Sequence, residues 1–408
     1  MAIEMNQKTG FNWQPIHQYV PVIFHYDVHF TSGIFQLDNP LLAQVIAADG
    51  ETTPKKVVAV VDTGLLRFHR DLLGQLTAYT EHYKDILTLA LSPLVVPGGE
   101  ATKNEPRLLE QIHKLINAAR LCRHSYLLVM GGGAVLDMAG YAAATAHRGI
   151  RLIRIPTTVV SQSDGGVGVK NGVNAFGKKN FLGTFMPPYA VLNDFDFLGT
   201  LSDRDWRAGI AEAVKVALIK DSGFFEFIRL HAQALVNRDI DAMQAIVYHS
   251  AKLHLEHIAR SGDPFEQGSS RPLDFGHWVA HKLEQLTDFR LRHGEAVAIG
   301  IALDSTYSYL QGLLSRLEWQ RILNTLAALG FILYLPELAE AAHQLEHPRC
   351  LFQGLTEFQE HLGGELTLML LQNIGQGIEV HEVDLSAYRK AISTLREFAE
   401  NTQMLAIS

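Results

Sequence analysis

Residues 125–146, SYLLVMGGGAVLDMAGYAAATA, place an uninterrupted apolar run, three consecutive glycines and a helix-favouring segment in direct succession. This order predicts a buried strand, a tight turn and a helix. Residues 55–64, KKVVAVVDTG, and residues 150–158, IRLIRIPTT, have the same apolar character and predict two more buried strands. Because helical segments separate these strands, the pattern indicates a parallel α/β sheet.

The rest of the chain first extends this plan and then changes character. Residues 20–30 alternate in polarity and predict a strand, and residues 85–96 predict another. Beyond about residue 200 the apolar residues recur with the period of a helix. We therefore expect two domains, a Rossmann-like α/β domain over residues 1–202 and a mainly helical domain over residues 203–408.

Composition excludes several classes of protein. The chain has 408 residues and a formal net charge of −8, with both signs spread along it, so it offers no basic block for nucleic acid. Its two cysteines, Cys122 and Cys350, allow no disulfide framework and no cysteine-rich zinc site. No uncharged apolar run reaches membrane-span length, and the first residues lack the features of a signal peptide. We expect a cytoplasmic protein that binds neither nucleic acid nor membrane.

The glycine turn at residues 131–133 offers a site for a nucleotide diphosphate. Glycines let the backbone approach a ligand, and the following helix presents free N–H groups and the positive end of its dipole. A plain tight turn between strand and helix gives the same pattern. However, Asp62, Thr157 and Thr158 end two of the predicted strands, where ligands gather in such sheets. These polar strand ends favour the dinucleotide interpretation.

Residues 163–183, SDGGVGVKNGVNAFGKKNFLG, predict a long glycine-rich loop that carries Asp164, Lys170, Lys179 and Asn180. Loops of this length inside a compact domain are usually functional or disordered. Lysines beside a nucleotide crevice suit a phosphorylated substrate. A solvated surface loop has the same composition, so this segment alone does not decide between the two.

Residues 273–300, LDFGHWVAHKLEQLTDFRLRHGEAVAIG, contain His277, His281 and His293. The first two lie four residues apart and share one face of a predicted helix. Glu212 lies in another predicted helix among alanine, isoleucine and valine, so we expect it to be buried with a cation nearby. Two imidazoles and one carboxylate form a ligand set typical of catalytic zinc. A salt bridge to the lysine three residues on, and histidines on an ordinary helical surface, give the same pattern.

An ordered series of motifs resembles the sugar phosphate cyclase family, of which 3-dehydroquinate synthase is the familiar member. The motifs are GGE-x-x-K at 98–103, GGGAVLDMAGYAAATAHRG at 131–149, PTTVVSQSDGGVGVKNGVN at 156–174, GKKNFLG at 177–183, GIAEAVK at 209–215, LDFGH-x-x-x-H at 273–281 and RHGEAVAIG at 292–300. The resemblance implies an N-terminal Rossmann-like domain, a mostly helical C-terminal metal-binding domain and a homodimer. It also implies NAD and a divalent metal, Zn²⁺ or Co²⁺, as cofactors.

The resemblance also assigns roles by motif position. The metal ligands would be Glu212, His277 and His293. The residues that contact NAD would be Asp62, Glu100, Lys103, Gly132, Gly133, Asp137, Thr157, Thr158, Lys179 and Thr200. The substrate and catalytic residues would be Asp164, Lys170, Lys179, Asn180, Lys215, Asp274 and His281, with Arg148 reaching the phosphate in the neighbouring subunit.

The reaction that the resemblance implies is a lyase reaction without net redox change. A substrate alcohol is oxidised transiently, and the resulting ketone acidifies the neighbouring C–H so that phosphate leaves. The ketone is then reduced again, the sugar ring opens, and an intramolecular aldol reaction closes a carbocycle. The substrate's own phosphate can serve as the base, so no dedicated basic side chain is expected.

Three positions depart from the 3-dehydroquinate synthase pattern. Asp274 stands where that enzyme has asparagine, Ser270 where it has arginine and, by ungapped count, Glu256 where it has lysine. The late segment GIEVHEVD at 377–384 also lacks the expected lysine. That arginine and lysine hold the carboxylate of a keto acid phosphate, and Ser270 and Glu256 in their place would leave an anion facing it. We therefore predict a substrate with a neutral end.

The chain is most similar to the 2-epi-5-epi-valiolone synthase-like and EboD-type branch of the family, so sedoheptulose 7-phosphate is the favoured substrate. One alternative is 3-dehydroquinate synthase itself. A second is an NAD-dependent alcohol dehydrogenase of the metal-dependent glycerol dehydrogenase type, against which the lysines at 163–183 argue. A third is a catalytically silent homologue that only binds its ligand.

Overall fold

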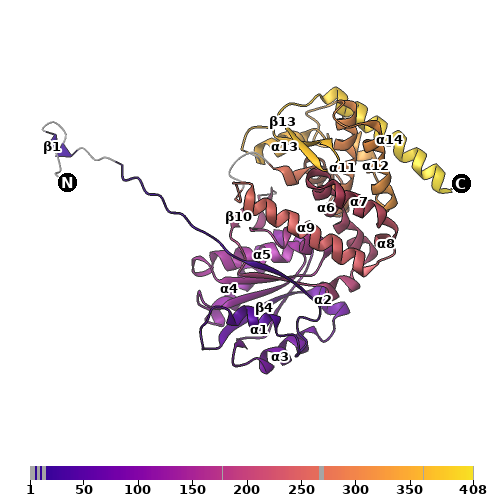
Figure 1. Ribbon diagram of the computed structural model, residues 1–408. Coiled ribbons are helices and arrows are strands. Elements are labelled where there is room, and N and C mark those ends of the chain that lie inside the picture. Colours follow the sequence, from indigo (N-terminus) through magenta and orange to yellow (C-terminus); the bar gives the residue numbers. More distant parts are fainter. Residues whose placement is uncertain are drawn as a thin grey trace.

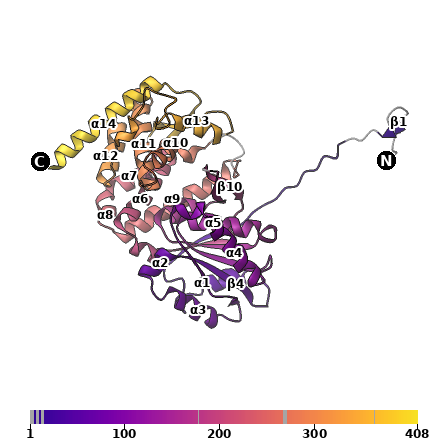
Figure 2. The same cartoon turned by 180° about the vertical axis from the view of Figure 1, so that it is seen from behind.

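The computed structural model describes residues 5–6, 10–11, 15–176, 178–265, 271–361 and 363–407. Its N-terminal half is an α/β layer structure and its C-terminal half is a helical body stacked on one end of the sheet (Figure 1). The view from behind shows the same two halves (Figure 2), which meet where α6 (Asp203–Lys220) and α9 (Ile240–Arg260) contact the turn η3 (Ser161–Gly165). None of the helices in the described ranges is both long and apolar enough to span a bilayer.

A seven-stranded parallel sheet forms the core of the N-terminal half. Its order is β3-β11-β8-β7-β4-β5, and β6 also pairs with β4. The strands are β3 (Asp27–Thr31), β4 (Lys55–Asp62), β5 (Leu87–Leu89), β6 (Leu94–Val96), β7 (Tyr126–Gly131), β8 (Arg151–Pro156) and β11 (Ala190–Asp194). The helices of this half are α1 (Leu41–Ala47), α2 (Thr63–Phe68), α3 (Leu72–His82), α4 (Pro106–Ala118) and α5 (Gly133–Thr145).

Alternating residues of β4 explain why helices cover both faces of this sheet. Val57 and Val61 belong to the core cluster that includes α1 and α3. Val58 and Val60 belong to the cluster on the opposite face, which includes α4 and α5. A strand that is buried on both faces reads as a continuous apolar run, and this is the run that the sequence shows at residues 57–61.

Three predicted segments differ from the structure. Only Asp27–Thr31 of the strand predicted over 20–30 is a strand, because the preceding residues have no partner strand within the described chain. The predicted strand at 85–96 is divided into β5 and β6, with Pro93 between them. The predicted loop at 163–183 contains a π-helical turn, η3 (Ser161–Gly165), and an antiparallel hairpin of β9 (Lys170–Ala175) and β10 (Lys178–Phe185).

The C-terminal half is a bundle around one central helix. Its helices are α6 (Asp203–Lys220), α7 (Ser222–Leu230), α8 (Ala232–Val236), α9 (Ile240–Arg260), α10 (His277–Leu286), α11 (His293–Leu310), α12 (Arg316–Ala328), α13 (Gln353–His361) and α14 (Leu385–Ile407). A hairpin of β12 (Leu368–Asn373) and β13 (Gln376–Val380) completes it. Every residue from Ala296 to Leu303 is buried, because α11 is apolar on all sides and other elements surround it.

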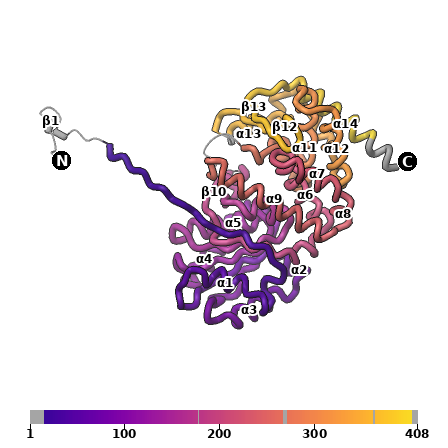
Figure 3. Tube along the Cα trace, in the orientation of Figure 1, coloured from indigo at the N-terminus to yellow at the C-terminus, as the bar shows by residue number. Residues whose placement is uncertain are grey.

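Residues 15–26 form an extended arm that leaves the body next to α9 and β10 (Figure 3). The side chains of Tyr19, Val20 and Ile23 are 78–90% exposed. At its base the arm is anchored, because the Tyr26 hydroxyl donates to the Val167 carbonyl at 2.9 Å and the Phe24 ring lies 5.9 Å from that of Phe265.

Candidate active site

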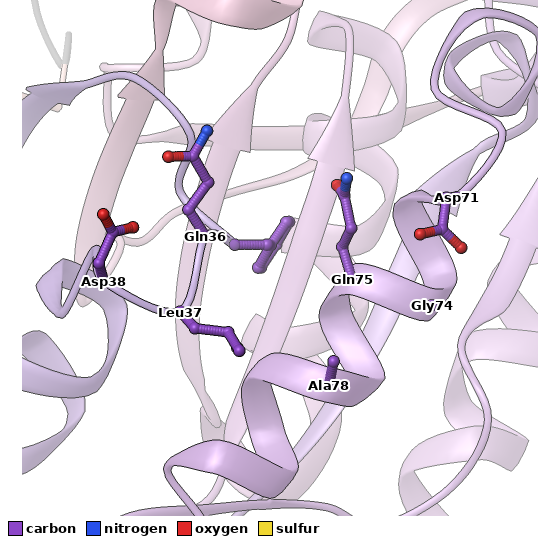
Figure 4. A pocket seen from close by; sticks show the side chains of 8 residues that line it. Gln36, Leu37, Asp38, Asp71, Gly74, Gln75 and Ala78 are labelled. Atoms are coloured by element: carbon purple, nitrogen blue, oxygen red, sulfur yellow. The ribbon is translucent and has the colours of Figure 1, made fainter.

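The candidate site lies where the carboxyl ends of β4, β7 and β8 meet the helices α6, α9, α10 and α11. Contacts of η3 with α6 and α9 join the two halves at this edge. A shallow hollow of about 390 Å³ between Gln36 and α3 lies elsewhere, on the outer face of the sheet domain (Figure 4). Its lining carries Asp38 and Asp71 and no basic side chain, so it does not suit a phosphate.

Glu212, His277 and His293 converge from three different helices. The His293 Nε2 atom lies 3.3 Å from Glu212 Oε1, and the His277 Nε2 atom lies 3.9 Å from the same oxygen. The other nitrogen of each ring faces a second partner. His277 Nδ1 lies 3.2 Å from the Phe275 carbonyl, and His293 Nδ1 lies 3.2 Å from a carboxylate oxygen of Glu284. Both Nε2 atoms therefore point at one carboxylate.

Three glycines allow these helices to approach one another. Gly276, before α10, has a φ of 76°, and a Cβ there would lie 2.7 Å from the backbone nitrogen of Ile301. A Cβ at Gly300 would lie 2.0 Å from the Gly276 carbonyl oxygen. A Cβ at Gly294 would lie 1.8 Å from the carbonyl oxygen of Ala208 in α6. Larger residues would push apart the helices that carry Glu212, His277 and His293.

The donor set has the chemistry of a metal site. Each of the three residues offers one ligand atom, and these atoms all lie within 4.8 Å of one another. Glu212 is 2% exposed, with the Lys215 ammonium 2.7 Å from its Oε2 atom and the two imidazoles facing its Oε1 atom. Lys215 balances the charge on the Oε2 side, and Oε1 is the oxygen that could join the two Nε2 atoms as a metal ligand. Two Nε2 atoms and one carboxylate oxygen fit tetrahedral Zn²⁺ with one position left for substrate.

The charges around this cluster are strongly coupled. Burial alone would raise the pKa of Glu212, but Lys215 and His293 outweigh it and lower the pKa to about 2. Burial would lower the pKa of His293, but hydrogen bonds to Glu212 and Glu284 raise it to about 9. Burial and Lys215 together lower the pKa of His277. Perturbed groups of this kind concentrate at functional sites.

A chain of ion pairs extends from the cluster toward the sheet. Lys215 is 2% exposed and bridges Glu212 and Asp164, whose Oδ2 atom lies 3.0 Å from the ammonium. The other oxygen of Asp164 lies 3.1 Å from Nδ1 of His254 on α9. Burial would raise the pKa of Asp164, but Lys215 and His254 hold it well below its ordinary value.

The remaining candidate substrate residues lie around this chain. Burial would raise the pKa of Asp274, but the charges of His277, Lys170, Lys215 and His281 lower it. Its carboxylate therefore belongs to the same cluster of charges. The His281 ring lies 5.6 Å from that of His277, and burial together with Lys179 holds its pKa well below the ordinary value.

Lys179 and Asn180 lie on β10, and Lys179 contacts α10. The Lys179 ammonium lies 3.4 Å from Glu284. Asn180 has a φ of 53°, and its backbone N–H donates to Asn174 Oδ1 at 2.8 Å. Arg148 lies apart from the cluster. It is exposed at the end of η2 (Ala146–Arg148), and its side chain has no ion pair or hydrogen bond with the described residues.

The candidate nucleotide residues line the end of the sheet. Asp62 accepts from the Gly64 N–H at 2.8 Å, and a Cβ at Gly98 would lie 2.3 Å from its carboxylate. Gly132 caps α5, and a Cβ at Gly133 would meet nothing within 4 Å, so the helix N-terminus is open to a ligand.

The other candidate NAD-contacting residues make polar contacts with one another or with neighbouring residues. Lys103 is buried and lies 2.8 Å from Asp137 and 3.7 Å from Glu100. The N–H of Thr157 donates to the Gly131 carbonyl. The remaining contacts are Thr158 Oγ1 with Ser161 Oγ at 2.8 Å and Thr200 Oγ1 with His69 Nε2 at 3.0 Å.

Residues that the sequence interpretation missed include His254, His257 and Glu284. His254 and His257 lie three apart in α9, a spacing that gives one helix face but no motif. Burial, Lys220, His254 and Lys170 lower the pKa of His257 to about 4.

An ungapped count aligned Glu256 with a substrate-binding lysine of 3-dehydroquinate synthase, but the Glu256 side chain does not point toward the site. Glu256 lies two residues after His254, which contacts Asp164, and two residues turn a helix so that the side chains point about 160° apart. Glu256 has no ion pair or hydrogen bond with the described residues. Ser270 lies outside the described residues.

Comparison with known proteins gives a consistent picture. Two family models match, 3-dehydroquinate synthase N-terminal over residues 93–208 and 3-dehydroquinate synthase C-terminal over residues 209–347. A 3-dehydroquinate synthase of Jannaschia sp. (strain CCS1) is 33% identical over 370 residues, which are 90% of this chain and 95% of the relative. A 2-epi-5-epi-valiolone synthase of Streptomyces glaucescens is 34% identical over 360 residues, 88% of this chain and 87% of the relative.

Among solved structures, ValA from Streptomyces hygroscopicus subsp. jinggangensis 5008 is similar over almost the whole chain. ValA is a 2-epi-5-epi-valiolone synthase whose structure has NAD⁺ and Zn²⁺ bound. Its TM-score is 0.80 at 29% identity, over 94% of this chain and 99% of that one.

Proposed function

This chain belongs to the 3-dehydroquinate synthase family of sugar phosphate cyclases, and on that premise we propose that it cyclises a heptulose 7-phosphate with NAD and a divalent metal. Sedoheptulose 7-phosphate is the favoured substrate and a cyclitol is the product. Two observations carry the proposal: the convergence of Glu212, His277 and His293, and the open N-terminus of α5 at the carboxyl end of the sheet.

Glu212, His277 and His293 would hold the metal, and NAD would lie along the sheet end. The NAD-contacting residues would be Asp62, Glu100, Lys103, Gly132, Gly133, Asp137, Thr157, Thr158, Lys179 and Thr200. When bound, the two cofactors supply reversible oxidation of a substrate alcohol, which makes phosphate elimination possible. The solved structure of ValA has both NAD⁺ and Zn²⁺ bound.

The chain's own side chains would orient the substrate. Lys170, Lys179, Asn180 and His281 would hold the substrate phosphate by charge and hydrogen bonds. In support, the charges of Lys170 and His281 act on Asp274, and that of Lys179 acts on His281. Asp164 and Lys215 form a buried pair within the same site, so they can fix hydroxyl groups without reorganising. The elimination can use the substrate's own phosphate as base, so the site needs no further basic residue.

The Asp274 carboxylate favours a substrate whose end is neutral. Its carboxylate lies amid the charges of His277, Lys170 and Lys215, and it remains ionised there. A keto acid would place a second carboxylate toward this anion, whereas a hydroxymethyl group can donate a hydrogen bond to it. The runner-up is 3-dehydroquinate synthase itself, which several relatives' names favour.

A second copy of the chain would cover the face that carries Arg148. This face exposes apolar side chains, because Phe181, Leu182 and Phe185 of β10 are 41–51% exposed and the arm of residues 15–26 lies beside them. Contiguous exposed apolar surface of this kind is typical of an interface. In such a homodimer Arg148 would reach the phosphate of the partner's substrate.

The decisive experiment measures phosphate release by the purified protein with NAD⁺ and Zn²⁺. Sedoheptulose 7-phosphate and the keto acid phosphate of 3-dehydroquinate synthase are offered separately. Release from the first alone is the expected result. Release from the second alone would overturn the neutral-end proposal and favour 3-dehydroquinate synthase. Accumulation of NADH without phosphate release would overturn the cyclase proposal as a whole.

A further inference from the structure

Glu284 connects the metal cluster to the phosphate lysine. It is 5% exposed on α10, seven residues after His277. One of its oxygens, Oε2, lies 3.2 Å from Nδ1 of His293 and 3.4 Å from the ammonium of Lys179. Lys179 is on β10 of the sheet domain, so this one carboxylate joins the two halves of the molecule.

The contact with His293 has a defined chemical consequence. A carboxylate that accepts from Nδ1–H holds the imidazole in the tautomer whose Nε2 lone pair is free. In this chain that Nε2 atom points at Glu212. Such outer partners of a ligating histidine set both its orientation and its basicity, and their loss typically weakens metal binding.

Glu284 could instead be a ligand itself, since Glu284, His281 and His293 also offer three atoms within 4.8 Å of one another. Two observations argue against that role. A metal there would lie beside the ammonium of Lys179, which is 3.4 Å from the same carboxylate. It would also have to take Nδ1 of His293, away from the buried oxygens of Glu212.

We propose that Glu284 is a positioning residue that orients His293 for the metal and holds Lys179 beside it for the substrate phosphate. This inference rests on the proposed function. Removing the carboxylate should therefore weaken two different bindings at once, those of metal and of inorganic phosphate. A residue that only stabilises the fold would change neither once the protein is folded.

The test compares Glu284→Gln with the wild type and with Glu357→Gln. Glu357, on α13, makes a similar carboxylate–lysine pair with Lys282 of α10; its carboxylate is half-exposed and also contacts Gln285. Zn²⁺ affinity is measured by competition with a chromophoric chelator, and the Co²⁺ absorption spectrum reports ligand geometry. Inorganic phosphate affinity is measured by calorimetry on metal-loaded protein with NAD⁺.

The expected result is a loss of Zn²⁺ affinity of roughly ten- to a hundredfold in Glu284→Gln, with an altered Co²⁺ spectrum and weaker phosphate binding. Glu357→Gln should match the wild type in all three measurements. Equal Zn²⁺ affinity in folded Glu284→Gln and wild type would overturn the inference. If the glutamine variant does not fold, Glu284→Asp takes its place, since it keeps the charge but withdraws the oxygens from His293.

A third variant separates the two contacts. Lys179→Gln leaves Glu284 and His293 in place, so it should lose phosphate affinity and keep Zn²⁺ affinity. Loss of both in this variant would contradict the division of roles. A wild type that binds no Zn²⁺ would instead overturn the proposed function, which distinguishes that failure from failure of the inference.

Discussion

At the residue scale, the buried acids of this chain behave differently according to their partners. Glu212 and Asp164 lie beside Lys215 and remain ionised. Asp304, in α11, has no basic partner within the described chain. Its Oδ1 atom accepts from Trp278 Nε1 at 3.1 Å and from the Tyr388 hydroxyl at 2.9 Å. Burial raises the pKa of Asp304 to about 7, despite these two hydrogen bonds.

The raised pKa of Asp304 predicts a pH dependence of stability. The folded protein keeps a proton that the unfolded chain loses near pH 4, so the stabilisation is full below pH 4 and falls as the pH rises toward 7. Asp304→Asn should remove this dependence. Between pH 5 and 8 the unfolding free energy of the wild type should fall by about 3 kcal/mol more than that of the variant.

Urea unfolding at several pH values measures that difference, because all other titrating groups are common to both proteins. Parallel curves for the wild type and Asp304→Asn would show that Asp304 is ionised throughout this range.

At the element scale, the closeness of α10 and α11 depends on Gly300. A Cβ in Gly300→Ala would lie 2.0 Å from the carbonyl oxygen of Gly276, and backbone atoms cannot yield as a flexible side chain does. We expect a loss of stability of roughly 1–3 kcal/mol and weaker Zn²⁺ binding, because His277 follows Gly276 directly. Thermal unfolding and chelator competition measure the two effects.

Gly223→Ala is the matched control for this substitution. Gly223 also lies in a helix, α7, but a Cβ there would meet only the Asp221 carboxylate at 3.3 Å. It should retain the stability and metal affinity of the wild type. If Gly300→Ala behaves like this control, the glycine contact between α10 and α11 does not position His277.

Elements whose periodicity is strong could be predicted from the sequence, and elements set by tertiary pairing could not. The apolar run at 57–61 indicated a strand buried on both faces, which β4 is. The hairpin of β9 and β10 looked like a loop because six glycines interrupt residues 163–183. Buried Arg154 helps to set its conformation by donating to the Lys170 carbonyl and to Asn171 Oδ1, and no local pattern reports such a distant contact.

The candidate site shows the same division. Residues within ordered motifs, such as His277 and His293, could be identified together because the motifs themselves resemble a known family. His254 and Glu284 could not, since their significance comes from contacts with Asp164 and His293 on other elements. The ungapped count gave Glu256 the wrong position because the direction of a side chain depends on its phase in the helix, which a sequence count does not contain.

At the scale of the whole molecule, the exposed Arg148 gives the last prediction. If Arg148 completes the partner's site, Arg148→Ala and Glu212→Gln should each inactivate their own homodimers. A mixed dimer should regain one working site. That site has an intact metal cluster from the Arg148→Ala subunit and an intact Arg148 from the Glu212→Gln subunit. Random pairing makes half of the dimers mixed, and each mixed dimer has one of its two sites active. Co-expression should therefore restore about a quarter of wild-type activity.

Phosphate release by the co-expressed pair, purified through two different tags, measures this recovery directly. Each variant expressed alone is the control, and mixing the two purified homodimers without subunit exchange should restore nothing. Activity in the Arg148→Ala homodimer near that of the wild type would place Arg148 outside any active site. Complete inactivity of the mixed dimer, with both homodimers folded, would place Arg148 in its own subunit's site, because no subunit of the mixture then holds both intact residues.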